Sequence, residues 1–496
     1  MIFKIHYGLW YGALVGIIPF MFNYAVEYAG ATGTQQGILY TVLPFVALLA
    51  KPAICSVADK YAAHHHCLLF FISTTILGYG SLAIYPFFPK LIEGNKDLVW
   101  ILYCLAALIG NTSMCIVNSI GDSLAINSCQ RKDVSYGQYR LWGPVGFGIF
   151  GAIWGIANEI PSMPKYTPGI LTMVAILIAN SLLIAFWYDK EEFKVLDRVE
   201  TQDSGPLPSA NYGATTDQRL VGSGDGASAE SPKVERFSLL WKLSSQHKSI
   251  FAYIFLFTFC GIMTGIHWQF FFRYLEQLAS KDQQNFSTIA TLALPVQALG
   301  GELVFFILAG RILKKLGCSF TLVCCLLSFA ARYLLYSYVI PNVSIYWILL
   351  VELLQGPAFG LMYCVLTHQA NYYSQKIDEI VASSSDPGDV QLKNSLHATL
   401  QGVLGASFEV TIIYSNTYAI SINISSLTSR ALLNHKQGLG LGLGAIVGGR
   451  SYDIAPVLMW RIAGYSALSV AILCIIVTIF SLVSRSVRKP PADVEL

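Results

Sequence analysis

Charged residues are scarce in this sequence. Only 12% of its 496 residues are Asp, Glu, Lys or Arg, whereas soluble domains carry about 25%. Hydrophobic residues make up 54% of the chain, so the composition indicates a protein whose solvent is largely lipid. The net charge is only +3, and no basic run is interleaved with aromatic residues. A nucleic-acid partner is therefore not expected.

Signatures of catalysis are missing as well. The sequence has no P-loop, no nucleophile elbow and no His/Cys metal set, which argues against an enzyme, a cofactor, a bound metal and direct ATP drive. Its 11 cysteines include no CxxC pair, and we expect them to serve as small core hydrophobes. A cleavable signal peptide is not expected either, because the first apolar stretch, about 7–29, is too long for an h-region.

Long apolar runs dominate what is present. A spanning helix needs roughly 20 apolar residues, and the chain offers a regular series of such runs. We predict spans at about 6–29, 36–57, 67–88, 98–121, 137–158 and 168–188, and again at 249–272, 288–310, 319–340, 345–367, an interrupted eleventh and 456–483. The predicted fold is all-α and polytopic, with two six-helix bundles.

A polar segment separates the two bundles. Residues 189–247 are rich in Gly, Ser, Asp and Thr and have little apolar surface to bury, so we expect a disordered linker. The predicted domains are then a first bundle over 1–188, a second bundle over 248–485 and a tail over 486–496.

The distribution of Lys and Arg predicts the orientation. Cytoplasmic loops are enriched in these residues, and both termini and the linker are therefore predicted to be cytoplasmic, in the plasma membrane or another endomembrane. Two sequons, at Asn285 and Asn342, then lie on the opposite side as candidate glycosylation sites. On this assignment the internal connections carry Lys60, Arg131, Lys132, Arg311, Lys314, Lys315, Lys376 and Lys393, against Lys90, Lys96, Lys165 and Lys281 outside.

The eleventh span is interrupted. Residues 396–409 and 437–449 each read as part of an apolar, glycine-studded helix of the kind that packs in membranes. Removing about 410–436 would join them into one span of ordinary length. We expect this segment to be an insertion, such as a splice variant or gene-model error; a genuine re-entrant loop is the alternative.

Five ionisable residues lie inside predicted spans: Asp122, Arg140, Glu302, Arg332 and Glu352. Such residues are costly in lipid and usually face a cavity or a partner. Opposite charges could bind a polar solute and carry a proton, or they could be structural pairs that hold helices in register. The positions of Asp122 and Arg140 near helix ends favour the structural alternative somewhat. We expect His267 to be a polar packing residue.

The stretch 50–60, AKPAICSVADK, resembles the loop 2–3 signature of the major facilitator superfamily, Gly-x-x-x-Asp-Arg/Lys. Asp59 and Lys60 match the signature, whereas Cys55 replaces its glycine. A weaker echo, AGRILKK, occupies 309–315 at the matching place in the second half. The resemblance implies a major facilitator fold with alternating access, and a gating role for Asp59 and Lys60.

A second motif, YGQYRLWGPVGF at 136–147, is similar to the fifth helix of the lactose permease and of the eukaryotic facilitator group called domain-containing protein 6. In the permease, the arginine of this motif pairs with an acid at the end of helix four and grips the sugar. The resemblance gives these roles to Arg140 and Asp122. Phe147 replaces the tryptophan that stacks on the sugar, which keeps an aromatic face but loses the indole donor.

The second half carries the matching residues. Glu302 resembles the permease's substrate-contacting acid on helix eight, and Arg332 resembles its arginine on helix nine. Glu352 and Gln355 stand where the permease has its histidine and its proton-carrying glutamate. Because Gln cannot carry a proton, the resemblance leaves Glu302 or Glu352 as the carrier, with Arg332 in the same coupling network.

We therefore expect a monomeric secondary transporter that moves a small polar organic solute across the bilayer, with protons as the candidate coupling ion. Arg140, Asp122, Phe147 and Glu302 are the predicted solute-binding residues. The rival hypothesis is a membrane receptor or scaffold that keeps the fold without moving solute, because fold does not fix function. Ionisable residues in both halves favour transport, since a scaffold has less reason to bury them.

Overall fold

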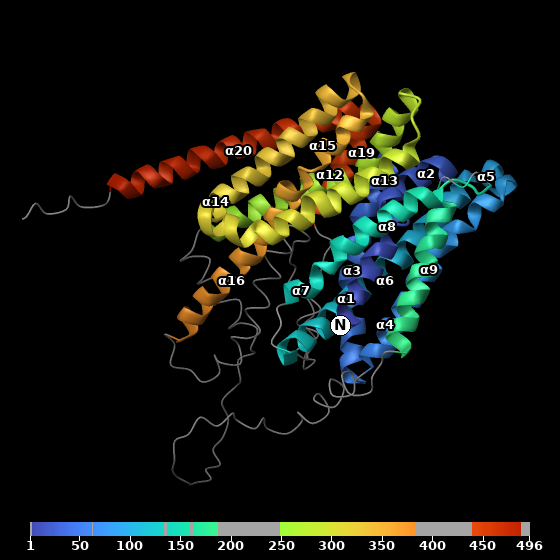
Figure 1. The fold of residues 1–496 in the computed structure, drawn as a ribbon, viewed down its shortest axis with the longest axis horizontal. Helices are drawn as coiled ribbons and strands as arrows, with labels where there is room; N and C mark the ends of the chain where they lie inside the picture. The colour runs from blue at the N-terminus through green and yellow to red at the C-terminus, as the bar shows by residue number, and fades with distance from the viewer. Residues whose placement is uncertain are drawn as a thin grey trace, which may run out of the picture.

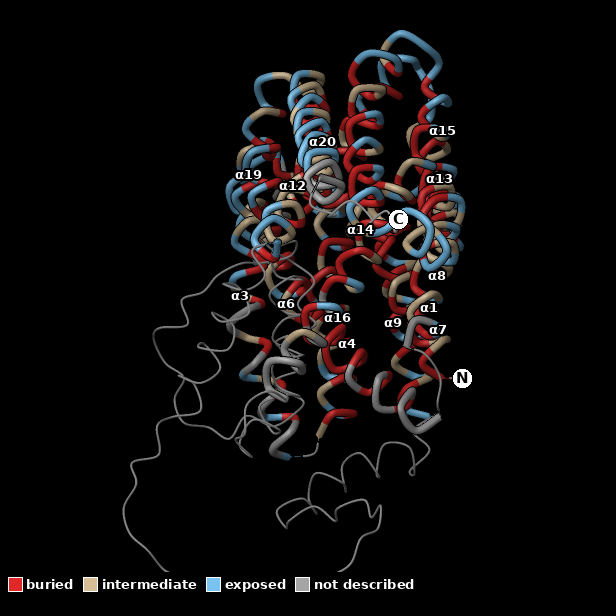
Figure 2. Tube along the Cα trace, turned by 90° about the vertical axis from the view of Figure 1, so that its left-hand side faces the viewer, coloured by how far each residue is buried: buried red, intermediate tan, exposed pale blue. Residues whose placement is uncertain are grey.

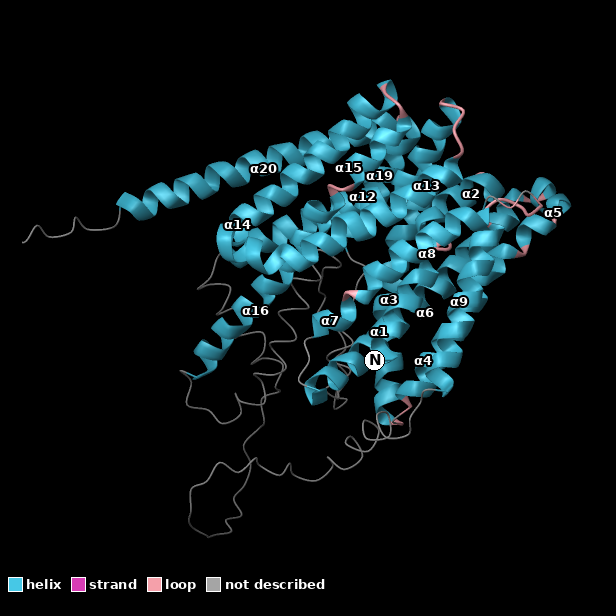
Figure 3. Ribbon diagram, in the orientation of Figure 1, coloured by secondary structure: helices cyan, strands magenta, loops and turns pink. Residues whose placement is uncertain are grey.

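The computed structural model describes most of the two predicted bundles. The described residues are 2–61, 63–132, 136–158, 160, 162–186, 249–382 and 439–487. Within these residues every regular element is helical, as Figure 3 shows. The predicted linker at 189–247 and the predicted insertion at 410–436 lie outside the described residues, and the domain boundaries remain predictions.

The first bundle is built from long apolar helices, and shorter helical segments interrupt some of them. Its elements are α1 (Ile2–Leu14), α2 (Met21–Ala29), α3 (Gly33–Lys60), α4 (His64–Gly80), α5 (Pro89–Gly94), α6 (Lys96–Lys132), α7 (Tyr136–Arg140), α8 (Trp142–Asn158) and α9 (Thr167–Phe186). The break between α1 and α2 contains Pro19, whose missing N–H cannot join the helical hydrogen-bond ladder.

The second bundle repeats this plan with π-helical joints. Its elements are α12 (Ser249–Lys281), α13 (Phe286–Pro295), η4 (Val296–Leu303), α14 (Val304–Leu334), η5 (Leu335–Val339), α15 (Ile348–Glu352), η8 (Gly356–Gly360), α16 (Leu361–Ala382), α19 (Leu439–Ile454) and α20 (Pro456–Val487). α14 comprises two helices joined at Gly317, whose φ of 74° suits glycine.

The spans agree with a twelve-helix fold. Nine helical stretches among the described residues are long and apolar enough to cross a membrane, and one of them, Phe286–Asn342, contains two predicted spans. α3 and α19 supply the others. With 16 residues, α19 is shorter than the roughly 20 that a span needs, and the rest of the predicted eleventh span lies outside the described residues.

The two bundles meet along a seam between α3 and α19 that is lined by glycine. A Cβ added at Gly449 would lie 2.2 Å from the carbonyl oxygen of Gly33, and one at Gly37 would lie 2.4 Å from that of Ala445. The two backbones are therefore in direct contact. The Thr41 hydroxyl adds a hydrogen bond across the seam, donating to the Gly442 carbonyl at 2.8 Å. We call Gly33, Gly37, Ala445 and Gly449 the glycine seam.

The bundles are joined at one end of the molecule, which we call the closed end. In Figure 1 they lie side by side around α2, α13 and α19 and separate towards α16 and α4. The Phe20 ring stacks on Trp154, with ring centroids 3.6 Å apart. It also contacts Phe272 of the other bundle, with centroids 4.8 Å apart. The buried residues in Figure 2 follow the helix faces that pack within and between the bundles.

A carboxylate also clamps the closed end. Asp453 on α19 accepts hydrogen bonds from the backbone N–H groups of Gly33 and Thr34, at 2.6 and 2.7 Å, and from the Thr34 hydroxyl at 2.6 Å. The first turn of a helix has N–H groups without intrahelical partners and a partial positive charge. The second bundle therefore caps a helix of the first.

Candidate functional site

The first half contributes a cluster of aromatic and polar side chains. Tyr7 and Tyr11 lie one turn apart on α1, and Asn118 and Asp122 lie one turn apart on α6, so each pair shares a helix face. The Tyr7 hydroxyl donates to Asp122 Oδ1 at 2.5 Å, and the Tyr11 hydroxyl donates to Asn118 Oδ1 at 3.0 Å. Trp10 Nε1 also donates to Asn118 Oδ1, at 2.8 Å.

Arg140 completes this cluster. Its guanidinium carbon lies 4.2 Å from the centroid of the Tyr11 ring and 5.6 Å from that of Tyr7. Cation–π contacts of this kind hold a guanidinium flat over a ring. Gly143 makes the approach possible, because a Cβ there would lie 3.1 Å from the Tyr11 ring. We call Tyr7, Tyr11, Asn118, Asp122 and Arg140 the arginine platform; the structure thus brings the predicted Asp122 and Arg140 together around Tyr7.

The position of α8, which follows Arg140, is fixed by its glycines. A Cβ added at Gly146 would lie 1.9 Å from the carbonyl oxygen of Gly8 on α1, so the two helices touch through their backbones. Phe147 follows on α8 and is half-buried against the core.

In the second half, Arg332 and Glu352 form an ion pair in which both side chains are fully buried. Glu352 also accepts hydrogen bonds from Gln297 and the Tyr336 hydroxyl. Three donors therefore surround this carboxylate, as a buried charge requires.

Arg332 is equally well bound. Its guanidinium donates to Glu352, to Gln355 Oε1, to the Tyr336 hydroxyl at 2.6 Å and to His267 Nε2 at 3.0 Å. His267 Nε2 accepts this bond, so the ring proton of the neutral imidazole is on Nδ1. The expected packing role of His267 is thus too simple, because the residue is a direct partner of Arg332.

Glu302 lies beside the Arg332–Glu352 pair. It lies in η4, half-buried, and Oε1 accepts a hydrogen bond from Gln355 Nε2 at 2.8 Å. The oxygen of the same Gln355 side chain accepts from Arg332, so Gln355 connects Glu302 to that guanidinium. The predicted residues Glu302, Arg332 and Glu352 therefore belong to one hydrogen-bonded cluster, separate from the arginine platform.

A further cluster at the closed end centres on Glu276 of α12. This carboxylate is 4% exposed and accepts hydrogen bonds from three residues of the first half: Asn23 at 2.8 Å, Lys165 at 2.6 Å and Tyr166 at 2.8 Å. Arg273 of its own helix donates at 2.7 Å. Sequence analysis missed Glu276 because the predicted span ended at 272, whereas α12 continues to Lys281.

Lys165 lies between α8 and α9 and is shared by two acids. It contacts Glu276 at 2.6 Å and the exposed Glu27 at 3.3 Å. Partial burial lowers the pKa of Lys165, but the hydrogen bond and charge of Glu276, with the charge of Glu27, outweigh it and raise the pKa overall. The ammonium group therefore stays charged at neutral pH.

Both predicted glycosylation sites lie at the closed end. Asn285 is exposed and caps α13, with Oδ1 accepting from the Ser287 N–H at 3.0 Å. Asn342 is exposed, and its Nδ2 donates to the Tyr338 carbonyl at 2.8 Å. The side chains of the predicted gating pair, Asp59 and Lys60, lie outside the described part of the structure.

Two bundles of long apolar helices, with charged residues buried in each, indicate a polytopic membrane protein. The chain belongs to the MFS_1-like family, whose model matches residues 1–378. This confirms the expected major facilitator fold, and the family is one of transporters rather than of enzymes.

Individual relatives are distant. A melibiose permease from Enterobacter cloacae subsp. cloacae is 26% identical over 169 residues, which cover 33% of this chain and 37% of the permease. The match thus spans little more than a third of that relative. The structure of the nucleoside transporter NupG has a TM-score of 0.61 at 12% identity and covers 96% of this chain and 97% of its own. The structure of tetrameric PepTSo2 has a TM-score of 0.55 at 8% identity, and the match covers 98% of each chain.

Proposed function

We propose that this chain is a secondary active transporter that moves a small polar organic solute by alternating access, with protons as the coupling ion. One observation carries the proposal: each half holds ionisable side chains inside its bundle, with Arg140 over Tyr7 and Tyr11 in the first and Glu302 beside the buried Arg332–Glu352 pair in the second. Transporters of this type bind solute near the midplane at the interface of their repeats. A structure joined at one end fits one of the two access states.

Each solute-binding residue has a role that fits its contacts. Arg140 is the main anchor, held by contacts with the rings of Tyr7 and Tyr11, and Asp122 keeps Tyr7 in place. Phe147 on α8 supplies an apolar wall, and Glu302 faces the solute from the second half. The relatives, a melibiose permease and a nucleoside transporter, also favour a polar organic solute.

Proton coupling is best assigned to Glu302. The Glu352 carboxylate is held by Arg332, Gln297 and Tyr336, so a proton there would displace existing bonds. Glu302 accepts one side-chain amide bond, from Gln355. Protonation of Glu302 removes its negative charge and so changes the relative free energy of the two access states. Arg332 and Glu352 serve as the fixed pair beside it.

The proposal is tested by uptake into proteoliposomes across a panel of sugars, nucleosides, amino acids and organic acids. We expect Arg140→Ala to lower uptake of the transported solute at least about tenfold, because a charge-assisted anchor is lost. Arg140→Lys should retain only part of the wild-type uptake, since lysine lacks the planar, forked donor group of arginine. Lys90→Ala is the control, because Lys90 is exposed on α5, away from the proposed solute site. Normal uptake by Arg140→Ala would refute the proposal.

Coupling is tested at Glu302. We expect Glu302→Gln, which imitates the protonated acid, to abolish accumulation driven by a pH gradient while solute exchange without a gradient continues. The measurement is uptake with and without an imposed gradient in the same vesicles. Gradient-driven accumulation that persists in Glu302→Gln would remove this residue from the coupling step.

We also propose that the closed end faces away from the cytoplasm and that both termini are cytoplasmic. Asn285 and Asn342 are then available to the glycosylation machinery. We expect glycosidase treatment of the protein from eukaryotic cells to lower its apparent mass, and Asn285→Gln with Asn342→Gln to abolish this shift. A shift that survives in the double variant would contradict the assignment of these sites.

A further inference from the structure

Asn118 has an unbalanced set of hydrogen bonds. Its side-chain oxygen accepts from both Trp10 Nε1 and the Tyr11 hydroxyl, at 2.8 and 3.0 Å. These bonds fix the orientation of the carboxamide and occupy its oxygen. Its N–H₂ group, with two hydrogens to donate, therefore points away from the two aromatic donors.

This amide group lacks an internal acceptor. Among the described residues, Asn118 Nδ2 donates to no acceptor, although the residue is only 8% exposed. Buried amide groups almost always have a hydrogen-bond partner, from the protein or from a molecule that enters from solvent. Nδ2 is not sealed from solvent, unlike the buried amide nitrogens of Asn111 and Asn180. Asn118 thus presents a donor that a bound molecule can satisfy.

The neighbours of Asn118 define what that molecule should offer. Tyr11 connects Asn118 to Arg140, since its hydroxyl bonds to the amide while its ring lies 4.2 Å below the guanidinium. Oδ1 of Asp122 is taken by the Tyr7 hydroxyl, and Oδ1 of Asn118 by its two donors. Toward a solute, Asn118 and Arg140 therefore offer an amide donor and a cationic donor.

We propose that Asn118 is a specificity-determining residue that donates, beside Arg140, to an oxygen of the solute that carries no proton, a carboxylate or carbonyl oxygen. The inference rests on the proposed transport function and narrows its substrate class. A hydroxyl group fits less well, because its proton would need an acceptor that these two side chains do not provide.

The test uses the purified full-length chain and five probes. L-alanine and L-lactate carry a carboxylate, uridine carries carbonyl groups, and methyl β-glucoside and myo-inositol carry only hydroxyl and ether oxygens. Dissociation constants are measured by thermal stabilisation for wild type and variants. Asn118→Asp retains an acceptor for Trp10 and Tyr11 but loses the donor. Asn118→Leu has a similar shape, no donor and no charge, and covers the case in which the aspartate variant does not fold.

We expect a carboxylate or carbonyl probe to bind wild type, and its dissociation constant to rise at least about tenfold in Asn118→Asp or Asn118→Leu. Trp10→Phe removes the hydrogen bond from Trp10 to the Asn118 oxygen but keeps the N–H₂ group of Asn118. We expect it to change the dissociation constant less than about threefold. Binding of the hydroxyl probes alone, wild-type affinity in the Asn118 variants, or an equal loss in Trp10→Phe would overturn the inference. If no probe stabilises the wild-type protein, and none is taken up by proteoliposomes that contain it, the transport proposal itself fails.

Discussion

Replacing Glu352 with leucine is expected to lower the free energy of unfolding by about 3 to 5 kcal/mol, the usual cost of leaving one member of a buried ion pair alone. Both Glu352 and Arg332 are fully buried, so neither can turn to solvent. After the change, Arg332 keeps neutral partners such as Gln355 and Tyr336 but loses its counter-charge. Thermal melting in detergent micelles would measure the loss.

The double variant separates charge from shape. Arg332→Met combined with Glu352→Leu replaces the pair by apolar side chains of similar size, and we expect most of the lost stability to return. Glu27→Ala is the comparison, since it removes an exposed ion pair with Lys165 that is worth about 0–1 kcal/mol. A double variant as unstable as Glu352→Leu alone would mean that packing, rather than unpaired charge, causes the loss.

Replacing Glu276 with alanine is expected to open the closed end. This one carboxylate collects donors from Asn23, Lys165 and Tyr166 of the first half. Truncating one partner of a buried, hydrogen-bonded charge pair costs about 2 to 5 kcal/mol, which is roughly 30-fold or more in the equilibrium between joined and separated ends. Lys165 is half exposed, so its ammonium group can return to water when the end opens.

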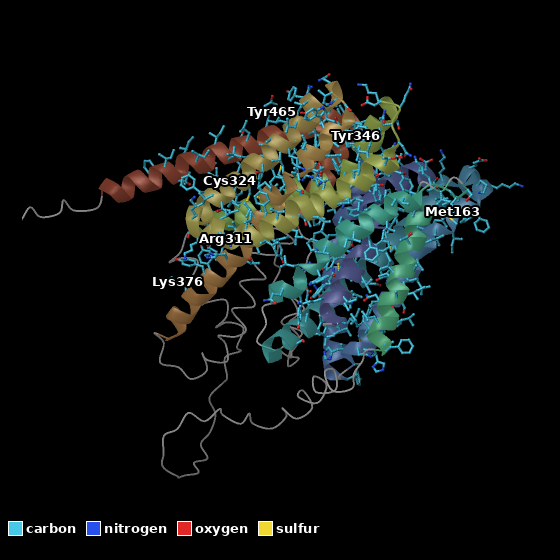
Figure 4. The ribbon with its side chains drawn as sticks, viewed as in Figure 1. Met163, Arg311, Cys324, Tyr346, Lys376 and Tyr465 are labelled. Atoms are coloured by element: carbon cyan, nitrogen blue, oxygen red, sulfur yellow. The ribbon has the colours of Figure 1, made fainter. Side chains whose placement is uncertain are left out.

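Spin labels at Met163 and Tyr346 would measure this opening. Both residues are exposed, and Figure 4 shows them at the closed end on opposite bundles. In Glu276→Ala we expect the distribution of distances between the labels to gain a longer component. Glu27→Ala removes only the exposed partner of Lys165 and should leave the distribution unchanged. Equal distributions in wild type and Glu276→Ala would show that this cluster does not hold the bundles together.

Much of the fold could be predicted because lipid imposes simple rules. Each membrane-spanning helix must be apolar and about 20 residues long, and the sequence shows this directly. Helix ends were harder to place, because polar side chains can be buried there by contacts that only the fold creates. α12 runs on to Lys281 because Glu276 and Arg273 find partners at the closed end.

The candidate site was predictable only where it is charged. Asp122, Arg140, Glu302, Arg332 and Glu352 stood out against apolar surroundings, and the structure brings them into two connected clusters. Their neutral partners did not stand out. Asn118, Gln297 and Tyr336 are unremarkable in a membrane helix until a second helix supplies the group that they bind.

The glycine seam has a consequence for the entropy of each transport cycle. An interface lined by Leu or Met loses rotamer freedom whenever it closes, about 0.5–2 kcal/mol for each side chain that is fixed. Gly33, Gly37, Ala445 and Gly449 have no side-chain rotamers to lose, so α3 and α19 come together without that penalty. The bundles can then meet and part many times with little change in side-chain order.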